Sequence, residues 1–149
     1  MAEPKYPTVS LLVFVDDELD DNVALAMREL VAHLSASGHW TLGSPAFVDG
    51  LDESGVRTCG VHLLLHDARS DVGLSLPPDT DLRQLKETKR VLEGAAELSR
   101  RLGVDIGVEY SGESVGWIHD GEPDEMLREG LIGEWEREHL RRHGGQAIR

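Results

Sequence analysis

The alternation of apolar and polar positions along the chain predicts elements in the order β-α-β-β-α-β-β-α. Residues 8–15 are almost continuously apolar and rich in β-branched side chains, which predicts a buried strand. Residues 18–36 then change to helical spacing, with Leu19, Val23 and Met27 on one stripe and Gly38 as a natural end.

The rest of the chain continues this order. Residues 39–50 and 56–68 are predicted as two strands joined by a polar, glycine-containing loop, and residues 69–81 form a loop that contains a double proline. Residues 81–102 carry a second helical stripe. Residues 104–110 and 114–120 alternate as a hairpin, and residues 121–143 form a third helix with Pro123 in its first turn.

This order predicts an α+β protein. Its first six elements match the ferredoxin-like split βαβ sandwich, β-α-β-β-α-β, to which the chain adds a C-terminal strand and helix. A length of 149 residues suits a single domain, 1–149, with flexible ends at about 1–6 and 143–149.

The charge of the chain narrows the classes of partner. There are 28 acidic against 15 basic residues, for a net charge of −13, which disfavours binding to nucleic acid or to an anionic membrane. No apolar run is long enough to span a bilayer, and the first ten residues lack the apolar centre of a signal peptide, so a cytoplasmic protein is expected. The single cysteine, Cys59, excludes an internal disulfide, and we expect its thiol to be buried. No cofactor is expected.

A dense acidic cluster follows the first predicted strand. Its members are Asp16, Asp17, Glu18, Asp20 and Asp21. Asp17 stands where the N-cap of the next helix is expected, with Asp20 three residues further on. Two carboxylates satisfy the free N–H groups and the dipole of a helix, and the surplus predicts a cationic partner.

The stretch LLVFVDDELDD resembles the opening of a receiver domain. That resemblance implies a magnesium ion held by Asp16 and Asp17 beside a phosphorylatable Asp67. The chain departs from the family after residue 68, because one helix, one hairpin and one helix replace the remaining strand–helix units. A degenerate, Mg²⁺-binding regulator is the second hypothesis, which this stretch supports.

Three further hypotheses depend on isolated residues or on an exposed surface. Zinc could be held by some of His33, His39, His66 and His119. A small ferredoxin-like enzyme could use a cleft around His66 or Glu109. An assembly subunit would instead present a large apolar face.

The surplus acids gather in three patches, at residues 16–21, 49–53 and 120–125, all at expected strand ends and loops. With SVGWIHDGEPDEMLREGLIGEW as a terminal strand and helix, this small acidic chain resembles the immunity proteins of bacterial toxin systems. The resemblance implies a non-enzymatic inhibitor, monomeric or homodimeric, that occludes the active site of a cognate toxin or binds another basic protein surface by electrostatic steering. The residues expected to bind the partner are Asp16, Asp17, Glu18, Asp20, Asp21, Asp49, Asp52, Glu53, Trp117, Asp120, Glu122 and Asp124.

Overall fold

The computed structural model describes residues 7–15, 19–51, 55, 57–67 and 76–143. The ends expected to be flexible lie outside these residues, except for His143, which ends the last helix. The elements are β1 (Thr8–Val15), α1 (Asp21–Ala36), β2 (Ala46–Leu51), β3 (Arg57–His66), α2 (Pro78–Leu102), β4 (Ile106–Tyr110), β5 (Glu113–His119), β6 (Glu122–Pro123), the π-helix η1 (Met126–Gly133) and α3 (Glu134–His143).

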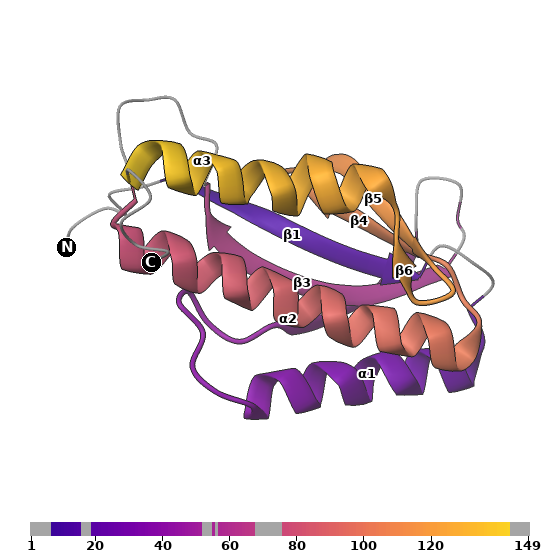
Figure 1. Cartoon of the computed structure of the whole chain (residues 1–149). Helices are drawn as coiled ribbons and strands as arrows, with labels where there is room; N and C mark the ends of the chain where they lie inside the picture. The colour runs from indigo at the N-terminus through magenta and orange to yellow at the C-terminus, as the bar shows by residue number, and fades with distance from the viewer. Residues whose placement is uncertain (1–6, 16–18, 52–54, 56, 68–75, 144–149) are drawn as a thin grey trace.

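The strands form one six-stranded sheet in the order β2-β3-β1-β4-β5-β6. Central strand β1 pairs antiparallel with β3 on one side and with β4 on the other. The remaining pairings are also antiparallel, and the helices all lie against one face of the sheet (Figure 1). The opposite face, which we call the open face, has none of the described helices over it.

The α+β class is therefore confirmed. The sheet is larger than the sheet of a simple split βαβ sandwich, because β5 and β6 extend it beyond β4, and its strand order differs accordingly. The C-terminal addition consists of β5, the short strand β6 and a helix that changes from π to α geometry at Glu134.

Three predicted segments are corrected by the structure. The helix expected from residue 81 begins at Pro78, inside the segment expected to be a loop, because proline is well suited to the first turn of a helix. Residues 39–45 were expected in a strand, but β2 begins only at Ala46, because the side chains before it are held by the helices. The Trp40 indole donates to the Leu34 carbonyl oxygen at 3.1 Å, and the Thr41 hydroxyl donates to a Glu87 carboxylate oxygen at 2.7 Å. The last helix was expected from residue 121, but it begins only at Met126, after β6.

The core lies between the sheet and the helices. Along β1, Leu11, Val13 and Val15 are at most 3% exposed, whereas the alternate side chains point to the open face. Gly60 lets β3 approach β1 closely, since a Cβ atom at this position would lie 2.1 Å from the Val13 carbonyl oxygen. The predicted first strand is thus confirmed, but only one of its faces is buried, whereas its continuous apolar run suggested burial on both.

Candidate functional site

The acidic patches meet at one end of the sheet. β1 ends at Val15, which pairs with the first residue of β4. The last residues of β2 and β5 and the first residue of β3 lie at this same end of the sheet (Figure 1). This arrangement brings together carboxylates from separate segments of the chain. We call this set the acidic end: Asp20, Asp21, Asp49, Asp105, Asp120 and Glu122. The predicted residues Asp16, Asp17, Glu18, Asp52 and Glu53 lie outside the described residues.

Neighbouring carboxylates of the acidic end have different roles. Asp20, and not Asp17 as expected, is the N-cap of α1, and its Oδ1 accepts from the Val23 amide at 2.9 Å. A capping carboxylate satisfies an otherwise unpaired N–H of the first turn. Asp21, one residue later, is fully exposed, and its closest charged partner is Arg57 at 3.8 Å. Asp20 therefore serves the fold, whereas Asp21 is available to a partner.

Arg57 partly neutralises the acidic end. Its Nε and Nη2 donate to both carboxylate oxygens of Asp49, at 3.2 and 3.1 Å. These hydrogen bonds, together with the charges of Arg57 and Arg28, hold the pKa of Asp49 below its usual range, against a smaller opposing effect of desolvation. Asp49 stays ionised, and it shares its negative charge with an exposed guanidinium.

The turn from β5 to β6 contributes the remaining members. Asp120 is exposed and has a φ of 50°, and Gly121 after it donates its N–H to the Ser99 hydroxyl at 3.1 Å. His119 Nδ1 lies 2.9 Å from an Asp105 carboxylate oxygen, which raises the pKa of His119. The turn is thus anchored to α2 by its backbone, while the carboxylates of Asp120 and Glu122 remain exposed.

Asp124 is committed to local structure. Its carboxylate accepts from the Leu127 amide at 2.9 Å and from the Trp117 amide at 3.2 Å, so it joins the start of η1 to β5. Trp117 itself lies half-buried on the open face of the sheet, next to Phe14. Asp124 and Trp117, both predicted to bind a partner, therefore differ in role: the Asp124 carboxylate is used within the fold, and Trp117 presents its side chain on the open face.

The receiver-like hypothesis requires Asp67 to lie near the end of β1. The Asp67 amide donates to the Pro7 carbonyl oxygen, so Asp67 lies beside the start of β1. Val15, the last described residue before Asp16, is at the other end of that strand, about 23 Å from its start by the rise per residue. A magnesium ion bound at the start of α1 could not contact Asp67.

The isolated histidines do not form a metal site. Within the described part of the chain, no group of three or more His, Cys, Asp or Glu side chains could hold a metal ion. His66 and Glu109, the two centres suggested for an enzyme, lie opposite Thr8 and Leu12 of β1, about 13 Å apart along the sheet. Cys59 is buried as expected, and desolvation raises the pKa of its thiol to about 11.

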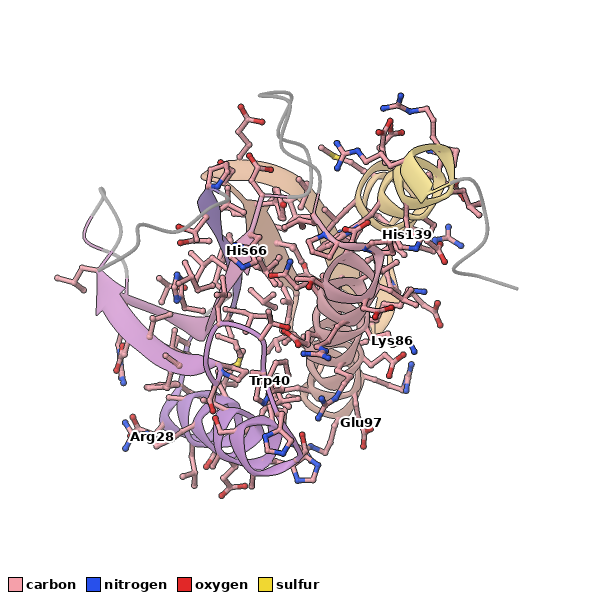
Figure 2. All side chains as sticks on the ribbon, turned by 90° about the vertical axis from the view of Figure 1, so that its left-hand side faces the viewer. Arg28, Trp40, His66, Lys86, Glu97 and His139 are labelled. Atoms are coloured by element: carbon pink, nitrogen blue, oxygen red, sulfur yellow. The ribbon has the colours of Figure 1, made fainter. Side chains whose placement is uncertain are left out.

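A buried polar cluster at the opposite end of the sheet was not predicted. Asp81, in the first turn of α2, accepts from the Trp135 indole at 2.8 Å and lies 2.7 Å from His139 Nδ1. All three side chains are at most 5% exposed, and Figure 2 shows His139 where α3 lies against α2. Trp135 and His139 are four residues apart, so one face of α3 presents both to Asp81. That spacing was the only sequence signal.

Comparison with family models and with curated proteins found no match, and neither did comparison of the fold with solved structures. Among the helices of the described residues, none has both the length and the apolar character needed to cross a bilayer.

Proposed function

We propose that this chain is an acidic binding protein that engages a basic protein partner through the acidic end of the sheet. The observation that carries the proposal is the convergence of carboxylates from the β1–α1 junction, the β2–β3 hairpin and the β5–β6 turn at one end of the molecule. Asp21, Asp120 and Glu122 are exposed there and are not needed to cap a helix.

The finer proposal is an immunity protein that neutralises a cognate toxin in the cytoplasm. A toxin that acts on nucleic acid has a basic active-site cleft, and an acidic surface is attracted to such a cleft over several ångströms before contact. Occlusion of the cleft would inhibit without chemistry in the binding protein. The excess of carboxylates over Arg57 at the acidic end supports this mechanism.

We also infer a fold relationship. The elements β1 to β4 with α1 and α2 would form a ferredoxin-like unit to which β5, β6 and the last helix are added. The position of β1 between β3 and β4, with β2 outside β3, supports this inference.

The test is protection from a toxin encoded next to this chain. Cells that express the toxin should die unless this chain is produced with it. The variant Asp21→Lys with Glu122→Lys should lose protection, whereas Glu29→Lys with Glu93→Lys changes the net charge equally on the helical side and should keep it. Binding of the purified pair at low salt should show an association rate that falls roughly tenfold or more for the first variant.

The salt dependence gives a second criterion. Because exposed charges are screened over about 8 Å at physiological ionic strength, the difference between the two variants should shrink as salt is added. Equal protection by both variants would contradict a role for the acidic end.

A further inference from the structure

The open face of the sheet carries apolar side chains outside the core. Alternation along the strands places Leu12 and Phe14 of β1, Val48 of β2 and Trp117 of β5 on this face. All four are half-buried, and none belongs to the core cluster between the sheet and the helices. They form an apolar surface with no described element over it.

Two aromatic rings lie at the centre of this surface. Phe14 and Trp117 meet edge to face, with ring centroids 6.4 Å apart. Both rings lie over Gly107 of β4, where an added Cβ atom would come within 2.5 Å of Phe14 and 2.8 Å of Trp117. The absence of a side chain at Gly107 lets the rings lie close against the sheet. The result is a rigid aromatic patch, the usual centre of a protein interface.

A shallow hollow of about 350 Å³ adjoins this patch. Its lining includes Leu12, Phe14 and Val48, with Asp49, Thr58 and Glu109 as polar members. Leu51 of the edge strand β2 also borders the hollow, but it pairs with Arg57, and alternation turns its side chain to the helical side. The hollow has the size for one or two apolar side chains of a partner, with the Glu109 carboxylate beside them.

The charge on this face is one-sided. Asp105, Glu109 and Glu122 lie on it by strand alternation and pairing. The histidines of this face, His62, His66 and His119, are cationic only when protonated. Of the lysines and arginines in the described residues, all except Arg57 lie on helices. Arg57 pairs with Leu51, and alternation turns it to the helical side. Figure 2 shows the helices gathered on the other side of the sheet.

We propose that the open face is the apolar centre of the binding surface, and that its occupant is a basic segment of the partner protein. This segment places an apolar side chain in the hollow beside Phe14 and its Lys or Arg side chains on Glu109, Asp105 and Glu122. The inference rests on the proposed function, because it takes the partner to be basic. It further specifies that the partner covers the open face of the sheet and that the apolar contacts beside Phe14 supply the affinity.

Charge complementarity selects this occupant over a second copy of the chain. If two open faces met, Glu109 and its neighbouring carboxylates would face the same carboxylates of the other copy, in a surface that is being desolvated. Like charges brought together across an interface are strongly unfavourable. A basic segment instead neutralises them while it covers the aromatic rings.

The experiment uses the full chain labelled with ¹⁵N and two synthetic peptides of the same length, one built from Leu and Lys and the other from Leu and Glu. At low salt, the Leu/Lys peptide should shift the amide signals of Leu12, Phe14 and Gly107 and the indole N–H signal of Trp117. The Leu/Glu peptide should shift none of them. Glu109→Lys should weaken binding of the Leu/Lys peptide about tenfold or more, whereas Glu93→Lys on α2, with the same charge change, should alter it less than about twofold.

The outcomes separate this inference from the proposed function. Shifts confined to Asp21, Asp120 and their neighbours, with the open face unchanged, would overturn the inference and leave the acidic end as the binding site. Binding of neither peptide, or of both equally, would overturn both. A dimer in light scattering whose contacts protect the open face would show that a second copy is the occupant, and would also overturn the inference.

A folding control keeps the result interpretable. Glu109→Gln preserves the shape of the side chain and removes its charge, so it should weaken binding less than Glu109→Lys does and leave the spectrum dispersed. If Glu109→Gln and Glu109→Lys both bind the Leu/Lys peptide like the unchanged chain, the carboxylate has no role and the inference is overturned.

Discussion

The first turns of α1 and α2 both contain an aspartate, but the two side chains lie in opposite environments. Asp21 begins α1 at the acidic end of the sheet and is fully exposed. Asp81 lies in the first turn of α2 near the other end and is 2% exposed, with Trp135 and His139 on its carboxylate. The helix dipole favours a carboxylate at both places. Asp81 is buried because α3 packs over the first turn of α2, and no described helix packs over Asp21.

This difference separates carboxylates that hold the fold from carboxylates that face solvent. A buried carboxylate is stable only while its hydrogen-bond donors are present, so its removal leaves polar groups unpaired in the interior. An exposed carboxylate exchanges its few contacts for water at little cost. Stability measurements therefore show which acids are free for a partner.

The largest effect is expected from Asp81→Ala. The substitution takes the carboxylate from the Trp135 indole and from His139 inside the α2–α3 interface, and should lower the free energy of unfolding by about 3–5 kcal/mol in urea titrations at pH 7. Asp79→Ala changes an exposed aspartate of the same helical turn and should cost less than about 1 kcal/mol. Equal costs for the two substitutions would remove the distinction between buried and exposed carboxylates.

Asp124→Ala should have the next largest effect. The Asp124 carboxylate accepts from two backbone amides, one at the start of η1 and one in β5, and its loss should cost about 1–2 kcal/mol. Glu125→Ala, at the adjacent exposed residue, is the matched control. If Asp124→Ala left stability unchanged but weakened partner binding, Asp124 would belong with the free acids, as its place in the sequence suggested.

Local patterns explain what the sequence could predict. The uninterrupted apolar run of residues 8–15 predicted β1 with its observed bounds. Such a run is typical of a strand buried on both faces, and the run could not show that the helices cover only one face of β1. The junction after it predicted carboxylates near a helix start, although the cap is Asp20. The contact of Asp81 with His139 joins residues 58 positions apart, and such a contact depends on how α3 packs, which periodicity does not encode.

The same reasoning explains the missed π-helix and open face. Residues 126–133 carry apolar spacing that suits an α-helix as well, so the pattern could not distinguish the two geometries. Strand alternation puts the neighbours Trp117 and Ile118 on opposite faces of the predicted strand 114–120. Which of them faced the helices depended on the pairing of β5 with β4, which places Ile118 opposite Ile106 in the core.

Asp20 and Asp21 offer the sharpest test of the comparison, because they are adjacent. Asp20→Ala removes the N-cap of α1 and should cost about 1 kcal/mol in the free energy of unfolding. Asp21→Ala should change stability by less than about 0.5 kcal/mol, because the side chain is fully exposed. The association rate with the partner should show the reverse order, because Asp21→Ala should slow association more than Asp20→Ala does. The same order in both measurements would mean that Asp21 acts through the fold.

The smallest expected effect is on the titration of Asp49. Because its folded-state pKa is lowered by Arg57, the Asp49 carboxylate contributes stability above the ordinary pKa of an aspartate, about 3.9, and loses it as the pH falls through the lower folded value. In an NMR titration of the side-chain carboxyl carbon, Arg57→Gln should return the pKa of Asp49 toward its ordinary value. Arg83→Gln, on the exposed side of α2, should leave it unchanged. An unaltered titration in Arg57→Gln would mean that the guanidinium does not neutralise Asp49 in solution, and Asp49 would then count fully among the acids that a basic partner meets.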